Sequence, residues 1–187
     1  MRVVAGTRRG TLLKSISHSS VRPTTDQVRE LVFNVISDIV RQSVVLDIFA
    51  GTGSLGIEAL SRGATKAIFI EENKKLHRVI RDNLEKTRFQ TSGEVLGMSA
   101  ERGIKLLAKK GNRFNLVFMD PPYAGGLVES TASLLDDFQL IDGGGMLVIE
   151  YSKDTNLDDC ISGNFRHLKT KIQGGTKVSF FEYGKRP

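Results

Sequence analysis

The segment Val44-Val-Leu-Asp-Ile-Phe-Ala-Gly-Thr-Gly-Ser-Leu-Gly56 carries the strongest indication of the fold of this 187-residue chain. Four of its first five residues are apolar, which predicts a buried strand, and a helical pattern begins at Ser54. Glycines 51, 53 and 56 between them have the spacing G-x-G-x-x-G, which lets the backbone turn tightly and approach a ligand. Strand, glycine loop and helix together predict the first unit of a nucleoside-binding α/β sheet.

Outward from this segment, apolar strands alternate with amphipathic helices. The predicted strands are 44–48, 66–70, 94–97, 114–119 and 146–149, and the predicted helices between them are 54–62, 74–86, 100–109 and 127–137. Such alternation is typical of a doubly wound, mostly parallel sheet that is covered on both faces. Two further strand-like runs, 165–172 and 178–183, are joined by a glycine-containing pentapeptide, so they predict an antiparallel C-terminal hairpin that completes a seven-stranded sheet.

The N-terminal region precedes this alternation. Residues 2–5 and 11–16 predict a small β-hairpin, and Thr24-Thr-Asp-Gln27 fits a capping box for one amphipathic helix over 28–40. We therefore expect a basic hairpin arm over residues 1–22 and a main domain over 23–187 that includes the leading helix.

Composition narrows the class of protein. The chain has 27 Lys and Arg residues against 21 Asp and Glu, and its single cysteine, Cys160, excludes an internal disulfide or a thiolate metal cluster. The three histidines are scattered, so no metal site is predicted. No apolar run approaches the length of roughly 20 residues that spans a bilayer, and there is no secretory signal. We therefore expect a cytoplasmic protein without membrane contact.

Positive charge gathers at the N-terminus. The first 25 residues contain five Lys or Arg residues and no Asp or Glu, a pattern that suits a polyanion such as nucleic acid but also fits a solvated basic surface. The candidate RNA-binding residues are Arg8, Arg9, Lys14 and Arg22.

A carboxylate follows the second strand of the alternating series. Glu71 lies 20 residues after Gly51, where it can accept hydrogen bonds from ribose hydroxyls of either a dinucleotide or S-adenosylmethionine. Asp47, just before the glycines, would oppose a pyrophosphate, whereas it suits a cofactor that bears an ammonium and a sulfonium. The candidate cofactor-binding residues from this region are Asp47, Gly51, Gly53 and Glu71.

The segment Asp120-Pro-Pro-Tyr123 ends the fourth strand of that series, which we expect beside the first strand at the edge where ligands bind. An exocyclic base amine is a poor nucleophile because its lone pair is delocalised into the ring. Asp120 and the carbonyl of Pro121 can accept hydrogen bonds from its two N–H groups, so that the lone pair points at a methyl donor. Tyr123 can stack on the base, and Pro122 stiffens the turn. Hydride transfer calls for none of these groups.

These motifs resemble known families. Asp120-Pro-Pro-Tyr123 resembles the amino-methyltransferase motif, and Asp47 to Gly53 resembles the S-adenosylmethionine loop of class I methyltransferases. Arg22-Pro-Thr-Thr-Asp26, Leu31-Val-Phe-Asn34 and the segment from Leu46 to Leu60 are, in this order, similar to the bacterial 16S rRNA guanine-N2 methyltransferase family known as RsmD. The similarity runs nearly from end to end.

This resemblance implies a Rossmann-like class I fold, S-adenosylmethionine as methyl donor, and a guanine of 16S rRNA in the small ribosomal subunit as acceptor, with no oligomer required. It also implies that Thr24 and Thr25 lie near the methionine end of the cofactor, that Glu71 binds the ribose, and that residues 120–123 surround the guanine. Ser99 stands where many class I enzymes place Asp or Asn at the adenine, so it is the candidate for that contact.

Four alternatives remain open on the sequence alone. An adenine-N6 or cytosine-N4 DNA methyltransferase shares the Asp-Pro-Pro-Tyr chemistry, although little chain is left for a DNA-reading domain. Methylation of a protein side-chain amide is usually associated with Asn at the first motif position. A non-catalytic, nucleotide-responsive RNA-binding module would keep the arm and the glycine loop. An NAD-dependent oxidoreductase would bind NADH instead.

Overall fold

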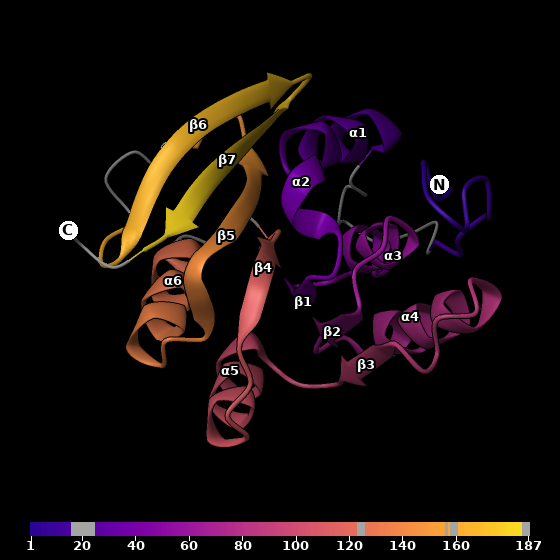
Figure 1. Cartoon of the computed structure of the whole chain (residues 1–187), viewed down its shortest axis with the longest axis horizontal. Coiled ribbons are helices and arrows are strands. Elements are labelled where there is room, and N and C mark those ends of the chain that lie inside the picture. Colours follow the sequence, from indigo (N-terminus) through magenta and orange to yellow (C-terminus); the bar gives the residue numbers. More distant parts are fainter. Residues whose placement is uncertain (16–24, 123–125, 156, 158–160, 185–187) are drawn as a thin grey trace.

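The computed structural model describes residues 1–15, 25–122, 126–155, 157 and 161–184. Its centre is one seven-stranded sheet with the strand order β3-β2-β1-β4-β5-β7-β6 (Figure 1). The strands are β1 (Val44–Ile48), β2 (Lys66–Ile70), β3 (Gly93–Leu96), β4 (Phe114–Met119), β5 (Ile141–Ser152), β6 (Phe165–Gln173) and β7 (Thr176–Tyr183). Strands β1 to β5 pair in parallel and β7 pairs antiparallel with both β5 and β6, as the sequence predicts.

Helices cover both faces of the sheet. The helices are α1 (Asp26–Val35), α2 (Ser37–Val40), α3 (Ser54–Ser61), α4 (Lys74–Lys86), α5 (Ala100–Lys109) and α6 (Leu127–Asp137). Buried side chains of α1 to α4 form one core cluster with one face of the sheet, whereas those of α5 and α6 form a second cluster with the other face. This two-faced burial explains why the central strands read as nearly continuous apolar runs.

The fifth strand is much longer than predicted. The apolar run 146–149 predicts four residues, but β5 extends from Ile141 to Ser152. A register shift between Phe114 and Leu116 on β4 lets the glycine run 143–145 stay in the strand, and a Cβ at Gly145 would lie 3.0 Å from the Asn115 carbonyl oxygen. The prediction failed because glycines that serve close backbone approach in a bulged strand look like a turn in sequence.

The leading helix differs from the single helix predicted over 28–40. It divides into α1 and α2 at Ile36, whose backbone has φ −104° and ψ 15°. The predicted capping box is also wrong by one residue, because the N-cap is Thr25, and its hydroxyl accepts a hydrogen bond from Val28 N at 3.2 Å. Val35 and Ile36 are β-branched, and Ser37 and Asp38 follow them, so the break falls in a stretch of low helix propensity.

The N-terminal segment forms a hairpin with a single bridge, Arg2 to Leu12, where two strands of four to six residues are predicted. The strands are short because distant side chains take their backbone groups. Glu58 of α3 accepts hydrogen bonds from Val4 N (2.8 Å) and Ala5 N (2.9 Å). Asn83 of α4 accepts from Lys14 N (2.7 Å) and donates to the Lys14 carbonyl oxygen (3.1 Å). The predicted boundary at residue 22 lies outside the described residues.

The hairpin turn contacts α3 through Gly6, and this contact yields a test with a matched control. Gly6 and Gly10 have nearly equal φ values, +82° and +84°, so alanine at either site costs about 1 to 2 kcal/mol of left-handed strain. A Cβ at Gly6 would lie 1.9 Å from the Ser61 carbonyl oxygen, whereas one at Gly10 would meet no atom within 4 Å. We expect Gly6→Ala to lower the free energy of unfolding by about 1 to 3 kcal/mol more than Gly10→Ala, measured by urea denaturation. Equal losses would show that the turn does not dock on α3.

Candidate active site

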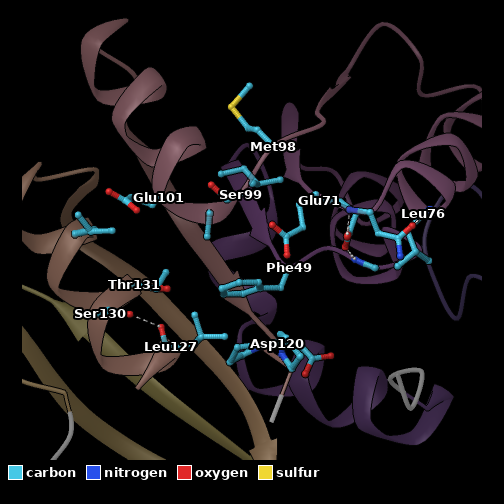
Figure 2. Close-up of a pocket in the computed structure, with 18 of the residues that line it drawn as sticks. Phe49, Glu71, Leu76, Met98, Ser99, Glu101, Asp120, Leu127, Ser130 and Thr131 are labelled. Carbon is cyan, nitrogen blue, oxygen red and sulfur yellow. Dashed lines mark hydrogen bonds between the residues drawn. The ribbon is translucent and has the colours of Figure 1, made fainter. Parts of the chain in front are cut away.

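A cavity of about 920 Å³ opens at the carboxyl edge of the sheet (Figure 2). Its walls come from the segments that follow β1, β2, β3 and β4 and from parts of α4, α5 and α6. Six residues singled out from the sequence lie on these walls: Gly51, Glu71, Ser99, Asp120, Pro121 and Pro122. The structure therefore brings the glycine loop, the acid after β2 and the Asp-Pro-Pro segment to one site.

The glycine loop is held in backbone conformations that favour glycine. Gly51 and Gly53 have φ values of +58° and +77°. Gly56 lies inside α3, where a Cβ would come within 2.3 Å of the Phe69 ring on β2. The third glycine thus lets α3 pack tightly on the sheet, in agreement with the role expected from the motif.

Asp47 lies beneath this loop and is not among the residues that line the cavity. Its Oδ2 accepts a hydrogen bond from Gly56 N at 2.9 Å. Burial, aided by the nearby Glu71 carboxylate and opposed by the Gly56 hydrogen bond, raises the Asp47 pKa from 3.8 to about 8. This hydrogen bond fixes the start of α3 on β1. The predicted contact of Asp47 with a cationic cofactor stays a prediction.

Glu71 joins the ends of β1 and β2. Its Oε2 accepts from Gly51 N and its Oε1 accepts from Asn73 N, both at 2.8 Å. Burial raises the pKa of this carboxyl, although both backbone hydrogen bonds and His77 oppose the shift. Each carboxylate oxygen has a second acceptor site, so Glu71 can hold the loop and still accept from hydroxyls in the cavity.

Ser99 begins the next wall of the cavity. It is the N-cap of α5, yet its side chain makes no capping hydrogen bond to that helix. Because the residue also lines the cavity, its hydroxyl is placed to contact a bound molecule.

No sequence motif marks the apolar parts of the cavity wall. Phe49, with φ +59°, belongs to the glycine loop, while Leu127 and Leu134 come from one face of α6. Element placement does indicate the two leucines: α6 begins a few residues after Asp120, so it starts at the same edge, and positions i and i+7 share a helix face. These side chains give the cavity apolar surface against which a flat ring can pack.

The remaining candidates lie away from this cavity or outside the described residues. Thr25 caps α1. A Cβ at Gly53 would lie 3.1 Å from the Ile80 side chain and 3.3 Å from the Phe69 ring, so this glycine lies against the core. Arg22, Thr24 and Tyr123 lie outside the described residues. The roles predicted for these five residues stay predictions.

The described basic residues of the arm lie on the α4 side of the molecule. The Arg8 guanidinium stacks 5.7 Å from the centre of the Phe89 ring, and Lys14 Nζ lies 2.6 Å from Asp82 Oδ2. Arg9 is exposed in the hairpin turn. Within the described part of the chain, no helix is long and apolar enough to cross a membrane. The predicted cytoplasmic location stays a prediction.

A mostly parallel seven-stranded sheet of this order, with an antiparallel β7 between β5 and β6, is that of the class I methyltransferases. The glycine loop after β1, the acid after β2 and the Asp-Pro-Pro segment after β4 agree with this class. The chain belongs to the family described as Conserved hypothetical protein 95, whose model matches residues 1–182. The resemblance to the RsmD methyltransferases is thereby confirmed.

Individual relatives agree with this assignment. Ribosomal RNA small subunit methyltransferase D of Escherichia coli (strain K12) is 33% identical over 182 residues, 97% of this chain and 89% of that protein. The protein of the same name from Haemophilus influenzae is 35% identical over 177 residues, 93% of this chain and 89% of that protein. The solved structure of yhhF from Escherichia coli superimposes with a TM-score of 0.86 at 31% identity, covering 100% of this chain and 99% of that one.

The buried carboxyl beneath the loop predicts a pH-dependent stability. The folded protein binds the Asp47 proton more tightly than the unfolded chain does, because the pKa rises from 3.8 to about 8 on folding. Relative to Asp47→Asn, which cannot titrate, the free energy of unfolding of the wild type should therefore fall between about pH 4 and pH 8, by up to about 1.4 kcal/mol per pH unit. Urea denaturation of both proteins from pH 5 to 9 measures this difference. A constant difference across that range would contradict the prediction.

Proposed function

We propose that this chain transfers a methyl group from S-adenosylmethionine to the exocyclic N2 amine of a guanine in 16S rRNA of the small ribosomal subunit. The observation that carries this proposal is that Glu71 and Asp120 line one cavity at the carboxyl edge of the sheet. One carboxylate is placed for a nucleoside cofactor, and the other for an acceptor amine.

The cavity walls fit S-adenosylmethionine. Glu71 offers acceptor sites for two ribose hydroxyls, and the Ser99 hydroxyl together with Phe49 and Leu134 offers a polar contact and apolar surface for an adenine. The cavity volume of about 920 Å³ lies within the usual range for small-molecule sites. When bound, the cofactor supplies an activated methyl group on a sulfonium.

Asp120 and Pro121 would orient the acceptor. The Asp120 carboxylate and the Pro121 carbonyl oxygen accept hydrogen bonds from the guanine amine, so the nitrogen lone pair faces the methyl group. Positive charge that develops on the nitrogen is stabilised by the carboxylate, which either only orients the amine or also accepts its proton. In the same proposal Tyr123 stacks on the base.

The acceptor is proposed from the relatives and from charge. Two relatives that match more than nine-tenths of the chain are named ribosomal RNA small subunit methyltransferase D. The basic arm supplies exposed cations for RNA phosphates, with Arg9 in the hairpin turn. A single flipped guanine identifies only one base, so selectivity must come from the shape of the surrounding RNA, which an assembled particle holds in one geometry.

Transfer of labelled methyl from S-adenosylmethionine, followed by nucleoside analysis, tests the function. We expect N2-methylguanosine, formed much faster on small-subunit particles than on protein-free 16S rRNA, because a preorganised loop lowers the ordering cost of binding. Asp120→Ala should lower the rate by about 10² to 10⁴ or more without changing cofactor affinity. The control Asp137→Ala, at an exposed position of α6, should leave the rate unchanged. Methylated adenine or cytosine, or full activity of Asp120→Ala, would contradict the proposal.

The ribose contact has a separate test. Glu71→Gln should weaken S-adenosylmethionine binding by about 1.5 to 3 kcal/mol, because charge-assisted hydrogen bonds to the hydroxyls are lost. Glu85→Gln makes the same charge change at an exposed position of α4 and should leave the affinity unchanged. Calorimetry measures both, and unfolding curves confirm that the Glu71→Gln variant is folded under the conditions used. Unchanged affinity would place the ribose elsewhere.

A further inference from the structure

A second basic segment lies at the other end of the chain. Between Ile161 and Phe181 there are four Lys or Arg residues and no Asp or Glu. The segment includes β6, one of the two edge strands of the sheet, whose residues from 166 to 169 are all exposed. Arg166 is paired with Glu182, but within the described part of the chain neither Lys169 nor Lys171 forms an ion pair.

Strand directions bring the end of β6 to the edge that holds the cavity. β5 is parallel to β4, β7 is antiparallel to β5, and β6 is antiparallel to β7, so β6 runs in the same direction as β4. In Figure 1 the arrowheads of β4, β5 and β6 all point toward the end of the molecule where α1 lies. Lys169, Lys171 and Gln173 therefore approach the same edge as Asp120.

These three side chains line an open groove of about 670 Å³ between β6 and α1. Lys169 lies opposite Phe180 and Lys171 opposite Val178, two residues of the core cluster that packs beneath α1. Across the groove α1 contributes mostly polar groups, and Gln173 Nε2 donates to Gln27 Oε1 at 3.3 Å. Two ammonium groups beside side-chain amides are suited to phosphate oxygens and sugar hydroxyls.

The sheet order gives this groove a position relative to the chemistry. Moving across the sheet from Glu71 after β2, one reaches Asp120 after β4 and then β5, β7 and β6. The groove is thus on the side of Asp120 away from Glu71, whereas the N-terminal hairpin contacts α3 and α4 near the opposite end of the sheet. Three strand spacings separate β4 from β6, about 14 Å, which corresponds to roughly four nucleotides of a stacked strand.

We propose that Lys169 and Lys171, with the groove they share with α1, bind backbone phosphates of the rRNA next to the target nucleotide. This inference rests on the proposed function, because it takes the acceptor to be RNA. The groove opens on the face of the sheet that α1 covers, whereas α5 and α6 of the opposite face line the cavity, so bound RNA crosses the carboxyl edge between them. Phosphate contacts with Lys169 and Lys171 would hold the RNA strand in place while the target base enters the cavity.

One carboxylate, Glu30 of α1, also lines the groove and gives the proposal a test of opposite sign. Removing Glu30 removes repulsion from a phosphate, whereas removing the lysines removes attraction. Glu30→Gln should therefore strengthen RNA binding at low salt, under conditions in which Lys169→Ala/Lys171→Ala weakens it.

The test measures the affinity for protein-free 16S rRNA across a salt series, together with methyl-transfer kinetics on small-subunit particles. For Lys169→Ala/Lys171→Ala we expect about tenfold weaker binding at low salt and a slope of log affinity against log salt that is smaller by about 1.4 to 1.8, since each lost phosphate contact contributes about 0.7 to 0.9. KM for the particle should rise, while kcat and S-adenosylmethionine affinity stay the same. The control Lys109→Ala/Lys110→Ala removes two exposed lysines at the C-terminal end of α5, at the opposite edge of the sheet.

Each outcome decides between explanations. Equal losses in both double variants would show that only net charge matters, and would overturn the proposal. So would unchanged RNA binding with self-association of Lys169→Ala/Lys171→Ala, because lysines on an edge strand can serve only to prevent pairing between sheets. If the wild type binds rRNA with the lysine-dependent slope but transfers no methyl group, the binding surface stands and the proposed function fails. If the wild type transfers methyl groups but the slope is the same in Lys169→Ala/Lys171→Ala, the proposed function stands and the proposed binding surface fails.

Discussion

The turn from β1 into α3 is the constraint on which the site depends, and two buried carboxylates hold it. Asp47 accepts from Gly56 N at the start of α3, and Glu71 accepts from Gly51 N in the loop itself. The first bond fixes the helix on β1, and the second ties the loop to the end of β2. Since α3 in turn carries Glu58, which accepts two backbone hydrogen bonds from the N-terminal hairpin, the position of the arm also follows from this turn.

Burying two carboxyls so close together is unfavourable for their charged forms, and burial raises the pKa of both. Asp47 is enclosed completely, so its environment changes little when a ligand enters the cavity. Glu71 differs because it lines the cavity, and hydroxyl donors from a bound ribose would favour its charged form. The same burial that makes Glu71 costly in the folded protein therefore increases what a hydroxyl-bearing ligand contributes to its stabilisation.

Much of this architecture could be predicted because local signals agreed with one another. The bounds of β1, β2, β4, α4, α5 and α6 match the residue ranges expected from periodicity, since each is a regular pattern bounded by turn residues. The juxtaposition of Glu71 and Asp120 followed from topology alone. What failed depended on partners distant in sequence: the short arm strands result from Glu58 and Asn83, and the extension of β5 from a bulge opposite Asn115.

The site was less predictable where one residue type serves two purposes. A carboxylate before a glycine loop suits a cationic ligand, and the hydrogen bond from Gly56 N gives Asp47 a structural role that the motif does not signal. Apolar wall residues such as Phe49 and Leu134 carry no motif, so only the placement of their elements identifies them.

The arrangement of charge explains how a chain of this size could select one nucleotide. Apart from the arm and its leading helices, nearly all of the chain builds the sheet and its covering helices, so little surface is left to read a base sequence. Two basic regions held at a fixed spacing can instead select RNA by the positions of its phosphates. The arm is bonded to α3 and α4, and Lys169 and Lys171 lie on β6. Asp120, after β4, lies between these two regions in the order of the sheet. Under the proposed function, only RNA whose phosphates match both positions would place a base at Asp120, and flexible RNA would lose entropy in adopting that shape. The two proposals together therefore predict that the enzyme favours a folded acceptor whose geometry is already set.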